Sequence, residues 1–179
     1  QPDLPKKEDV IGKPLSPYAV TKFVNELYAD VFSQSYNFDS IGLRYFNIFG
    51  RRQDPHGAYA AVIPIWIQSI IDNKEIYING DGSTSRDFTY IDNAVQANIL
   101  AALSKNKSGH QVFNIAAGGR TSLNDMFFSL VKIFSSHGVE YKKNPIYRDF
   151  RPGDVLHSEA DISKANSILK YMPSHDFDE

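Results

Sequence analysis

Cysteine is absent from this chain of 179 residues. Its absence excludes a disulfide framework, a cysteine-based metal site and a cysteine nucleophile. A reducing compartment fits this composition, and we expect a cytoplasmic protein. The five histidines are scattered and form no close ligand pattern such as H-E-x-x-H, so we also expect no bound metal.

Long apolar runs and a strong charge of either sign are missing too. The longest apolar stretch, residues 58–71, is interrupted by Pro64 and Gln68 and is too short to span a bilayer. We therefore expect no membrane segment, and no signal-peptide pattern is visible at the first residue. The formal net charge of −2 argues against general nucleic-acid binding.

A glycine-rich G-x-G-x-x-G turn, which lets backbone amides approach the pyrophosphate of a dinucleotide, is also absent. Gly118 and Gly119 lie between a predicted strand and a predicted helix, where a simple turn explains them. The chain thus lacks a cofactor fingerprint of its own. Because it starts without Met in a loop-like stretch and stops just after a predicted helix, we expect an internal segment of a longer protein.

The apolar residues that are present recur at alternating strand and helix spacings. We expect helices at residues 17–36, 60–73 and 161–169, and two more that begin near residues 92 and 122. Strands are expected at residues 40–46, 76–79, 86–90, 111–115 and 139–147. Strands that alternate with helices of this length predict an α/β fold with parallel pairing.

Local signals set several of these boundaries. Asn37 suits a left-handed end of the first helix, and Asp92 is expected to cap the third. Ser122 and Asp125 match the capping-box pattern. The apolar density of residues 40–46 predicts a strand that is buried on both faces. The helix that follows Asp92 presents an apolar face of Val95, Ile99, Leu100 and Leu103.

A tyrosine and a lysine lie four residues apart at the expected start of the first helix. Ser16 is a suitable N-cap, and Pro17 suits the first helical position. At this spacing Tyr18 and Lys22 share one helix face. A neighbouring ammonium group favours phenolate over phenol, so Tyr18 is a candidate acid/base for a sugar or alcohol hydroxyl. An ordinary amphipathic helix also explains the pattern, and on the pattern alone that interpretation would be preferred because the pattern is common.

Four segments, with their order and spacing, carry a resemblance to a known family. They are S-P-Y-A-V-T-K at residues 16–22, L-R-Y-F-N-I-F-G at 43–50, G-D-G and R-D-F within 80–88, and R-P-G-D at 151–154. Over essentially its whole length the chain resembles the extended short-chain dehydrogenase/reductase family that acts on nucleotide sugars. G-R-R-Q-D-P at 50–55 and G-A-Y-A-A-V at 57–62 look most similar to bacterial UDP-N-acetylglucosamine 4-epimerases.

The resemblance implies the C-terminal part of a Rossmann-like NAD-binding fold plus a smaller α/β nucleotide-sugar-binding domain. Residues 1–50 would form the distal part of the NAD-binding domain. Residues 51–179 would form mainly the substrate-binding domain, with some segments that return to the Rossmann sheet. The glycine-rich loop and a catalytic Ser or Thr would lie upstream of residue 1, so the segment alone should be inactive. The helix of Tyr18 and Lys22 would form a homodimer interface, which agrees with its apolar residues on more than one side.

For the parent protein, the resemblance implies NAD-dependent 4-epimerisation of UDP-N-acetylglucosamine and UDP-N-acetylgalactosamine in surface-polysaccharide (O-antigen) synthesis. Tyr18 would take the proton of the sugar O4 while NAD⁺ accepts the hydride from C4. Lys22 would favour ionised Tyr18 and hold the nicotinamide ribose. Phe46 would lie near the nicotinamide, although core packing explains it nearly as well. The alternatives are another UDP- or dTDP-sugar epimerase, a 4,6-dehydratase, or a non-catalytic nucleotide-sugar-binding or dimerisation module.

The resemblance also implies residues that hold a UDP-sugar. Arg86 and Arg151 would pair with the diphosphate, because guanidinium groups match phosphate oxygens. The alternative for each is a surface salt bridge, for example between Arg86 and Asp87. Asn47 would donate to a phosphate oxygen or close a turn, and Asp154 would accept from the uridine ribose or cap a turn. The residues expected to bound the uracil are Ala61, Val62, Tyr77 and Asn79.

Two further positions bear on the identity of the sugar. Ser158 lies four residues after Asp154, where related epimerases carry a gatekeeper residue. A small residue there would admit a 2-N-acetyl group. Gln53 would hydrogen-bond the acetamido group, or else face solvent from its loop. We therefore expect an N-acetylated substrate.

Overall fold

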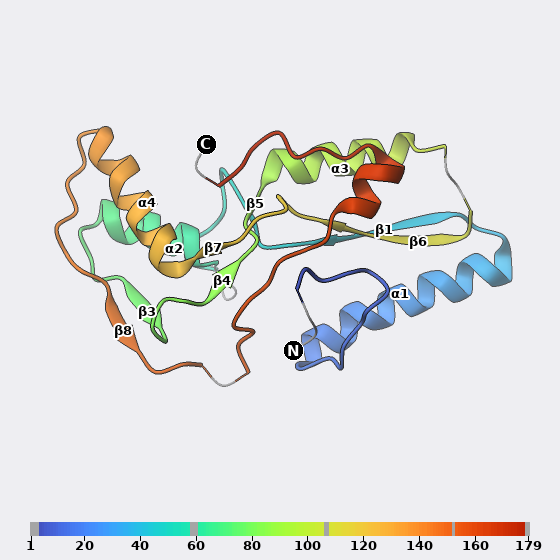
Figure 1. The fold of residues 1–179 in the computed structure, drawn as a ribbon, viewed down its shortest axis with the longest axis horizontal. Coiled ribbons are helices and arrows are strands. Elements are labelled where there is room, and N and C mark those ends of the chain that lie inside the picture. The colour runs from blue at the N-terminus through green and yellow to red at the C-terminus, as the bar shows by residue number, and fades with distance from the viewer. Residues whose placement is uncertain (1–3, 58–60, 106–107, 152, 178–179) are drawn as a thin grey trace.

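The computed structural model describes residues 4–57, 61–105, 108–151 and 153–177 (Figure 1). Its helices are α1 (Pro17–Tyr36), α2 (Val62–Ile71), α3 (Ile91–Leu103), α4 (Leu123–Ser136) and the short η1 (Ala165–Leu169). Its strands are β1 (Ser40–Tyr45), β2 (Ile48–Phe49), β3 (Tyr77–Asn79), β4 (Ser85–Arg86), β5 (Thr89–Tyr90), β6 (His110–Ile115), β7 (Thr121–Ser122) and β8 (Ile146–Arg148).

A parallel pair of strands organises one half of the molecule. β1 pairs with β6, and Ser40 to Tyr45 lie opposite His110 to Ile115. α1 covers one face of this pair and α3 the other (Figure 1). The β2–β5 and β3–β8 ladders are also parallel, whereas β4 and β7 are antiparallel. The α/β class with parallel pairing is therefore confirmed.

The first helix begins and ends where the sequence predicts. The Ser16 hydroxyl accepts a hydrogen bond from the Ala19 amide at 3.1 Å, and Pro17 occupies the first turn. Asn37 ends the helix with a φ of 51°. An ion pair fixes the helix to the neighbouring strand, because Arg44 of β1 donates from Nε and Nη2 to both carboxylate oxygens of Glu26, each at 2.7 Å.

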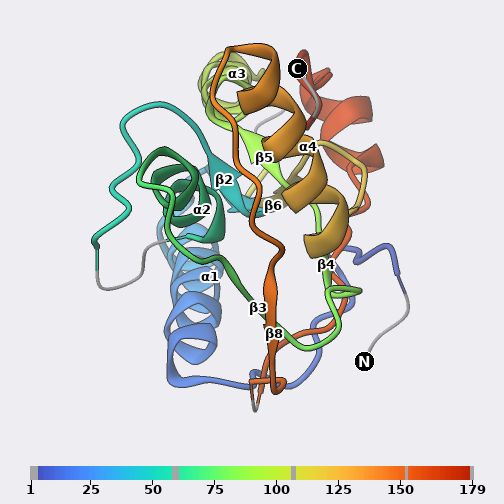
Figure 2. The same cartoon turned by 90° about the vertical axis from the view of Figure 1, so that its left-hand side faces the viewer.

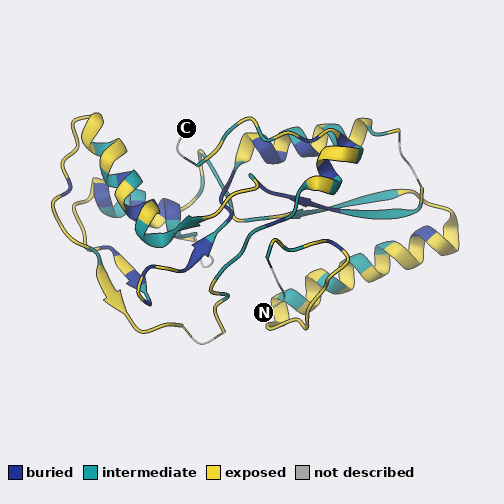
Figure 3. Cartoon of the chain, in the orientation of Figure 1, coloured by how far each residue is buried: buried dark blue, intermediate teal, exposed yellow. Residues whose placement is uncertain are grey.

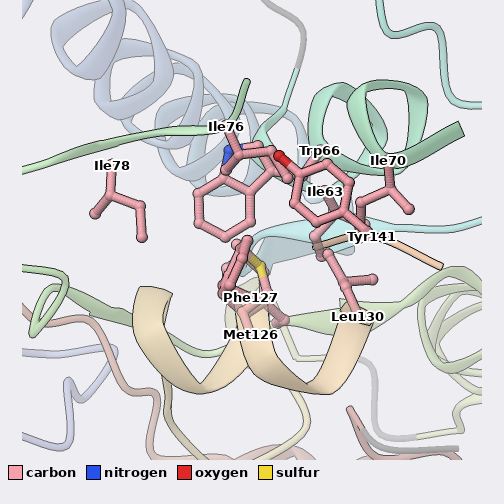
Figure 4. Close-up of a cluster of buried hydrophobic side chains, with 10 residues drawn as sticks. Ile63, Trp66, Ile70, Ile76, Ile78, Met126, Phe127, Leu130 and Tyr141 are labelled. Carbon is pink, nitrogen blue, oxygen red and sulfur yellow. The ribbon is translucent and has the colours of Figure 1, made fainter. Parts of the chain in front are cut away.

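The other half of the molecule is built on α2, α4 and β3, and Figure 2 shows α2 and α4 side by side in front. Between these helices the rings of Trp66 and Phe127 meet edge to face, with centroids 6.2 Å apart (Figure 4). Ile70, Ile76 and Met126 complete the centre of this core and are almost fully buried. A second core joins the first half, where β6 packs against α3 and η1.

Several predicted boundaries and burial patterns are wrong. β1 is only half-buried, and its Tyr45 is exposed, because β6 is its one paired neighbour among the described residues. Tyr90 caps α3, and Asp92 lies in its first turn instead. The buried side of α3 consists of Asn93, Ala94 and Ala97, whose small side chains allow close packing. Figure 3 shows both buried and exposed positions along this helix, and three residues of the predicted apolar face are exposed. Those exposed residues are Val95, Ile99 and Leu103.

Strand pairing explains two further differences, whereas two helices are shorter than predicted, α2 at Val62–Ile71 and the final η1 at Ala165–Leu169. The strand expected at 86–90 is divided into β4 and β5, because β4 pairs with β7 and β5 with β2. Of the strand expected at 139–147, only the end is paired, as β8. Residue 60, the expected start of the second helix, lies outside the described residues, and α2 begins at Val62.

Candidate functional site

The predicted acid/base pair lies at the exposed start of α1. The Lys22 ammonium nitrogen is 5.2 Å from the centroid of the Tyr18 ring, so the two side chains share one face as their spacing predicts. The Tyr18 side chain is 69% exposed and Lys22 is exposed as well. The N-cap of Ser16 and the ring of Pro17 fix the backbone that presents them. The pair can therefore offer a phenol and an ammonium group together to one ligand.

A cavity of about 250 Å³ lies between β2, α2, β3, β4 and the segment around residues 150–154. It brings together eight of the ten residues that the sequence predicts for substrate binding. These residues are Asn47, Ala61, Val62, Tyr77, Asn79, Arg86, Arg151 and Asp154. Residues far apart in the chain thus converge on one concave surface, which is the usual form of a small-molecule site.

Besides Tyr18 and Lys22, three predicted residues do not line this cavity. Gln53 follows β2, where its side-chain amide donates to the Ile48 carbonyl at 3.4 Å, and its Oε1 is buried without a hydrogen-bond partner among the described residues. Ser158 is half-buried, and its amide donates to the Ser85 carbonyl of β4. Phe46 is half-buried after β1, where its amide donates to the Ile115 carbonyl of β6.

Further lining residues were not predicted, and most of them are apolar. They are Ile48, Phe49, Ile63, Trp66, Thr84, Phe88, Leu123 and Phe150. The helical spacing of Ile63 and Trp66 would have placed them on one face of α2, but no local pattern distinguishes a core face from a cavity wall. Phe150 could have been predicted from the sequence, because it directly precedes Arg151, which was predicted to bind the ligand.

Arg86 is held in a partly buried position beside the cavity. Its Nη1 donates to the Ser85 carbonyl at 2.9 Å and to the Leu156 carbonyl at 3.2 Å. Burial lowers the pKa of Arg86, and the charge of Asp154 opposes that shift. A guanidinium group that has lost part of its hydration gains more from a phosphate than a fully hydrated one does.

The alternative of an Arg86–Asp87 salt bridge is wrong. The Asp87 side chain points away into the core, where it accepts from the backbone amides of Ala117 at 3.0 Å and Ala160 at 3.3 Å. Burial raises the pKa of Asp87 to about 6, against the opposing effect of these amide donors. The Asp87 carbonyl also accepts from the Asn47 side-chain amide at 3.3 Å. This bond uses one of the two N–H groups of Asn47, so the other can still serve a ligand.

Neither a metal cluster nor a membrane helix stands out in the part of the chain that the structure describes. Within it, no group of three or more histidine or acidic side chains is placed to hold a metal ion. The helices in the same part are too short or too polar to cross a membrane.

The parallel β1–β6 pair flanked by helices defines an α/β protein with a Rossmann-like half, and a cavity with both polar and apolar walls lies beyond this pair. The family of NAD-dependent epimerases and dehydratases matches residues 1–116. The chain belongs to this family.

Relatives and solved structures agree with this membership. The chain is 37% identical over 176 residues to a putative UDP-glucose 4-epimerase of Methanocaldococcus jannaschii, a match that covers 98% of the chain and 54% of that protein. A structure of the UDP-glucose 4-epimerase of Thermotoga maritima with UDP-glucose is 37% identical, with a TM-score of 0.89 over 98% of the chain and 54% of that protein. A UDP-N-acetylglucosamine 4-epimerase from Methanobrevibacter ruminantium, in complex with UDP-N-acetylmuramic acid, is 40% identical, with a TM-score of 0.86 over 97% and 53%. The chain spans about half the length of the curated relatives it matches.

Proposed function

We propose that the protein to which this chain belongs is an NAD-dependent 4-epimerase of UDP-N-acetylhexosamines that serves surface-polysaccharide synthesis. The proposal rests on one observation, namely that the same cavity is lined by Arg86, Arg151, Asp154, Tyr77 and Asn79. Two guanidinium groups match a diphosphate, a carboxylate can accept from ribose hydroxyls, and Tyr77 with Asn79 offers an aromatic surface and an amide for a base.

In this proposal the two halves of the chain bind different molecules, NAD and the UDP-sugar. Residues 1–50 belong to the NAD-binding domain, to which β6 returns by pairing with β1. Residues 51–179 form mainly the substrate domain around α2, α4 and β3. The exposed apolar side of α1 is the surface of a homodimer.

The groups at the start of α1 fit the nicotinamide ribose of NAD, because the Tyr18 phenol and the Lys22 ammonium both donate to hydroxyl groups and both face outward. When bound, NAD supplies the acceptor and later the donor of the hydride at sugar C4. Tyr18 takes the proton of the O4 hydroxyl and returns it after the sugar has turned. The Lys22 ammonium group, 5.2 Å from the centroid of the Tyr18 ring, holds the nicotinamide ribose beside the phenol.

Two residues and one comparison support an N-acetylated sugar. Ser158 does not line the cavity, but it is small at the position where the family resemblance expects a gatekeeper residue. Gln53 does not line the cavity either, but its Oε1 is an acceptor without a partner among the described residues and could accept from an amide N–H. The relative that is 40% identical is a UDP-N-acetylglucosamine 4-epimerase. Other relatives are UDP-glucose and UDP-glucuronate 4-epimerases, so the choice of sugar needs its own test.

The test incubates the full-length protein with NAD and, separately, UDP-N-acetylglucosamine, UDP-glucose or UDP-glucuronate. Proton NMR then resolves the 4-epimers. We expect conversion of the acetylated sugar, and we expect Tyr18→Phe to reduce kcat by about 10²–10⁴-fold because the acid/base group is lost. Tyr28→Phe is the matched control, since Tyr28 lies on the same helix and is 64% exposed.

Each result has a defined meaning. Conversion of UDP-glucose or UDP-glucuronate alone keeps the mechanism and replaces the substrate. Full activity of Tyr18→Phe would remove Tyr18 from the chemistry. No conversion of any of the three sugars would overturn the epimerase proposal.

A further inference from the structure

We propose that Phe177 is a positioning residue for the UDP-sugar cavity, held in place by a side-chain clamp from α3. This inference rests on the proposed function of the cavity. Phe177 is not among the described residues that line the cavity, yet its ring packs against two residues that do. Its centroid lies 5.5 Å from that of Phe88 and 5.9 Å from that of Phe49.

Phe49 and Phe88 come from two segments that are joined by short strands and by a hydrogen bond from the Asn47 side-chain amide to the Asp87 carbonyl. Phe49 ends β2, and Phe88 lies between β4 and β5. Two residues from each side form the β2–β5 ladder, which gives little backbone rigidity of its own. The positions of these two rings therefore depend on what packs behind them, and in the described residues Phe177 contacts both.

The segment that carries Phe177 is fixed by Asn93, a fully buried residue of α3. Asn93 Nδ2 donates to the His175 carbonyl at 2.7 Å. Its Oδ1 accepts from the amides of Ser174 at 2.8 Å and His175 at 3.2 Å, and from the Ser174 hydroxyl. One buried amide thus uses both its donor and its acceptor on the backbone of the tail, which an isosteric Asp or Leu could not do.

A second series of aromatic contacts, through His175 and Tyr90, connects the segment held by Asn93 to the cavity. The His175 ring lies 5.2 Å from the Tyr90 ring, and Tyr90 lies 5.6 Å from Phe49 in an edge-to-face contact. The tail therefore supports the same cavity wall through Phe177 directly and through His175 and Tyr90. Because rings in such packing define each other's orientation, removal of Phe177 should let Phe49 and Phe88 relax away from the ligand.

The experiment compares Phe177→Ala, Phe177→Leu and wild type in the full-length protein. Two quantities are measured, namely the Kd of UDP by calorimetry and the KM and kcat of epimerisation. We expect Phe177→Ala to raise Kd and KM about tenfold, with kcat within about twofold, since the acid/base pair on α1 is untouched. Phe177→Leu, which fills most of the volume, should restore most of the affinity.

Met172→Ala is the matched control, because Met172 lies in the same tail and is 66% exposed. Circular dichroism and thermal melting establish that each variant is folded at the assay temperature. Equal Kd and KM for Phe177→Ala and wild type overturn the proposal, as does an equal loss of affinity in Met172→Ala. If Phe177→Ala does not fold, Asn93→Asp carries the same comparison because it removes the donor that holds the His175 carbonyl, and an unchanged Kd in that variant overturns the proposal.

The same data separate this inference from the proposed function. Weakened UDP binding in Phe177→Ala together with no turnover by wild type would keep Phe177 as a positioning residue and remove the epimerase activity. Turnover by wild type with an unchanged KM in Phe177→Ala would keep the epimerase activity and overturn the role of Phe177. Absence of UDP binding by wild type would overturn both.

Discussion

At the scale of single residues, Asp87 makes the stability of the protein depend on pH. Its pKa in the folded state is raised to about 6 by burial, above the value of an exposed aspartate. Between those two values the folded state binds more protons than the unfolded state, so this contribution to stability falls as the pH rises. A shift of this size corresponds to about 3 kcal/mol between pH 4 and pH 7.

Comparison with Asp87→Asn isolates this effect. Asp81 and Asp161 act in the opposite direction, since hydrogen bonds from Ser83 and Ser163 lower the pKa of each. Urea unfolding of both proteins between pH 4.5 and 7.5 should show wild type gaining stability relative to Asp87→Asn on acidification, most steeply near pH 5, midway between the pKa of an exposed aspartate and that of Asp87 in the folded state. A free-energy difference that stays constant with pH would contradict the prediction.

A second prediction concerns the ion pair that joins α1 to β1. Arg44 and Glu26 make a two-pronged contact whose side chains are only 25% and 23% exposed, and Arg44 Nη1 also donates to the Glu8 carbonyl. Lysine keeps the charge but cannot form this fork, so Arg44→Lys should lower the free energy of unfolding by about 1–2 kcal/mol. The exposed Lys74–Asp72 ion pair is the control for this substitution. Lys74→Ala should change the free energy of unfolding by less than about 0.5 kcal/mol.

Residue types in family motifs predicted most of the polar residues that line the cavity, but not the apolar residues of its walls. Arg86, Arg151 and Asp154 stand in segments whose order resembles a known family, so they could be named from sequence. The places of Trp66 and Phe177 depend on contacts across the fold, because the same aromatic residue would satisfy a core, a cavity wall or a support behind it. The inward turn of Asp87 was missed for the same reason, since its partners Ala117 and Ala160 are distant in sequence.

At the scale of elements, the capping of α4 is a local device with a measurable contribution. Ser122 accepts from the Asp125 amide at 3.0 Å and donates to the Asp125 carboxylate at 2.6 Å. Ser122→Ala should therefore lower the free energy of unfolding by about 1 kcal/mol. Lys132→Ala, at an exposed position later in the same helix, should leave it nearly unchanged in the same denaturant titration. Equal effects of the two substitutions would mean that the cap is not important.

Elements with local boundary signals were predicted well, and elements that need distant partners were not. α1 is defined by Ser16, Pro17 and Asn37, all within or next to the helix itself. β2, β4 and β5 have two residues each, and their partners lie about 35–40 positions away in the chain. A run such as residues 86–90 reads as one strand until its two ends are seen to pair with different neighbours.

At the scale of the whole molecule, α1 presents an apolar surface that we assign to a homodimer. Val20, Val24, Leu27 and Val31 are each between 37% and 57% exposed along this helix. Apolar residues repeated along a helix about 30 Å long are typical of an interface rather than of scattered surface positions. Figure 3 shows most of α1 in yellow, the colour of exposed residues.

We expect the full-length protein to sediment as a dimer, and Leu27→Glu with Val31→Glu to sediment as a monomer, because two buried charges per subunit would face each other across the interface. Phe128→Glu on α4 is the control, since Phe128 is 63% exposed on a different element and should leave the dimer intact. A wild-type monomer would show that another part of the protein covers this face of α1. Dissociation by Phe128→Glu as well would place the interface elsewhere.

The epimerase assay on the monomeric variant then tells whether dimerisation is needed for the Tyr18–Lys22 pair to work, since that pair lies at the start of the same helix.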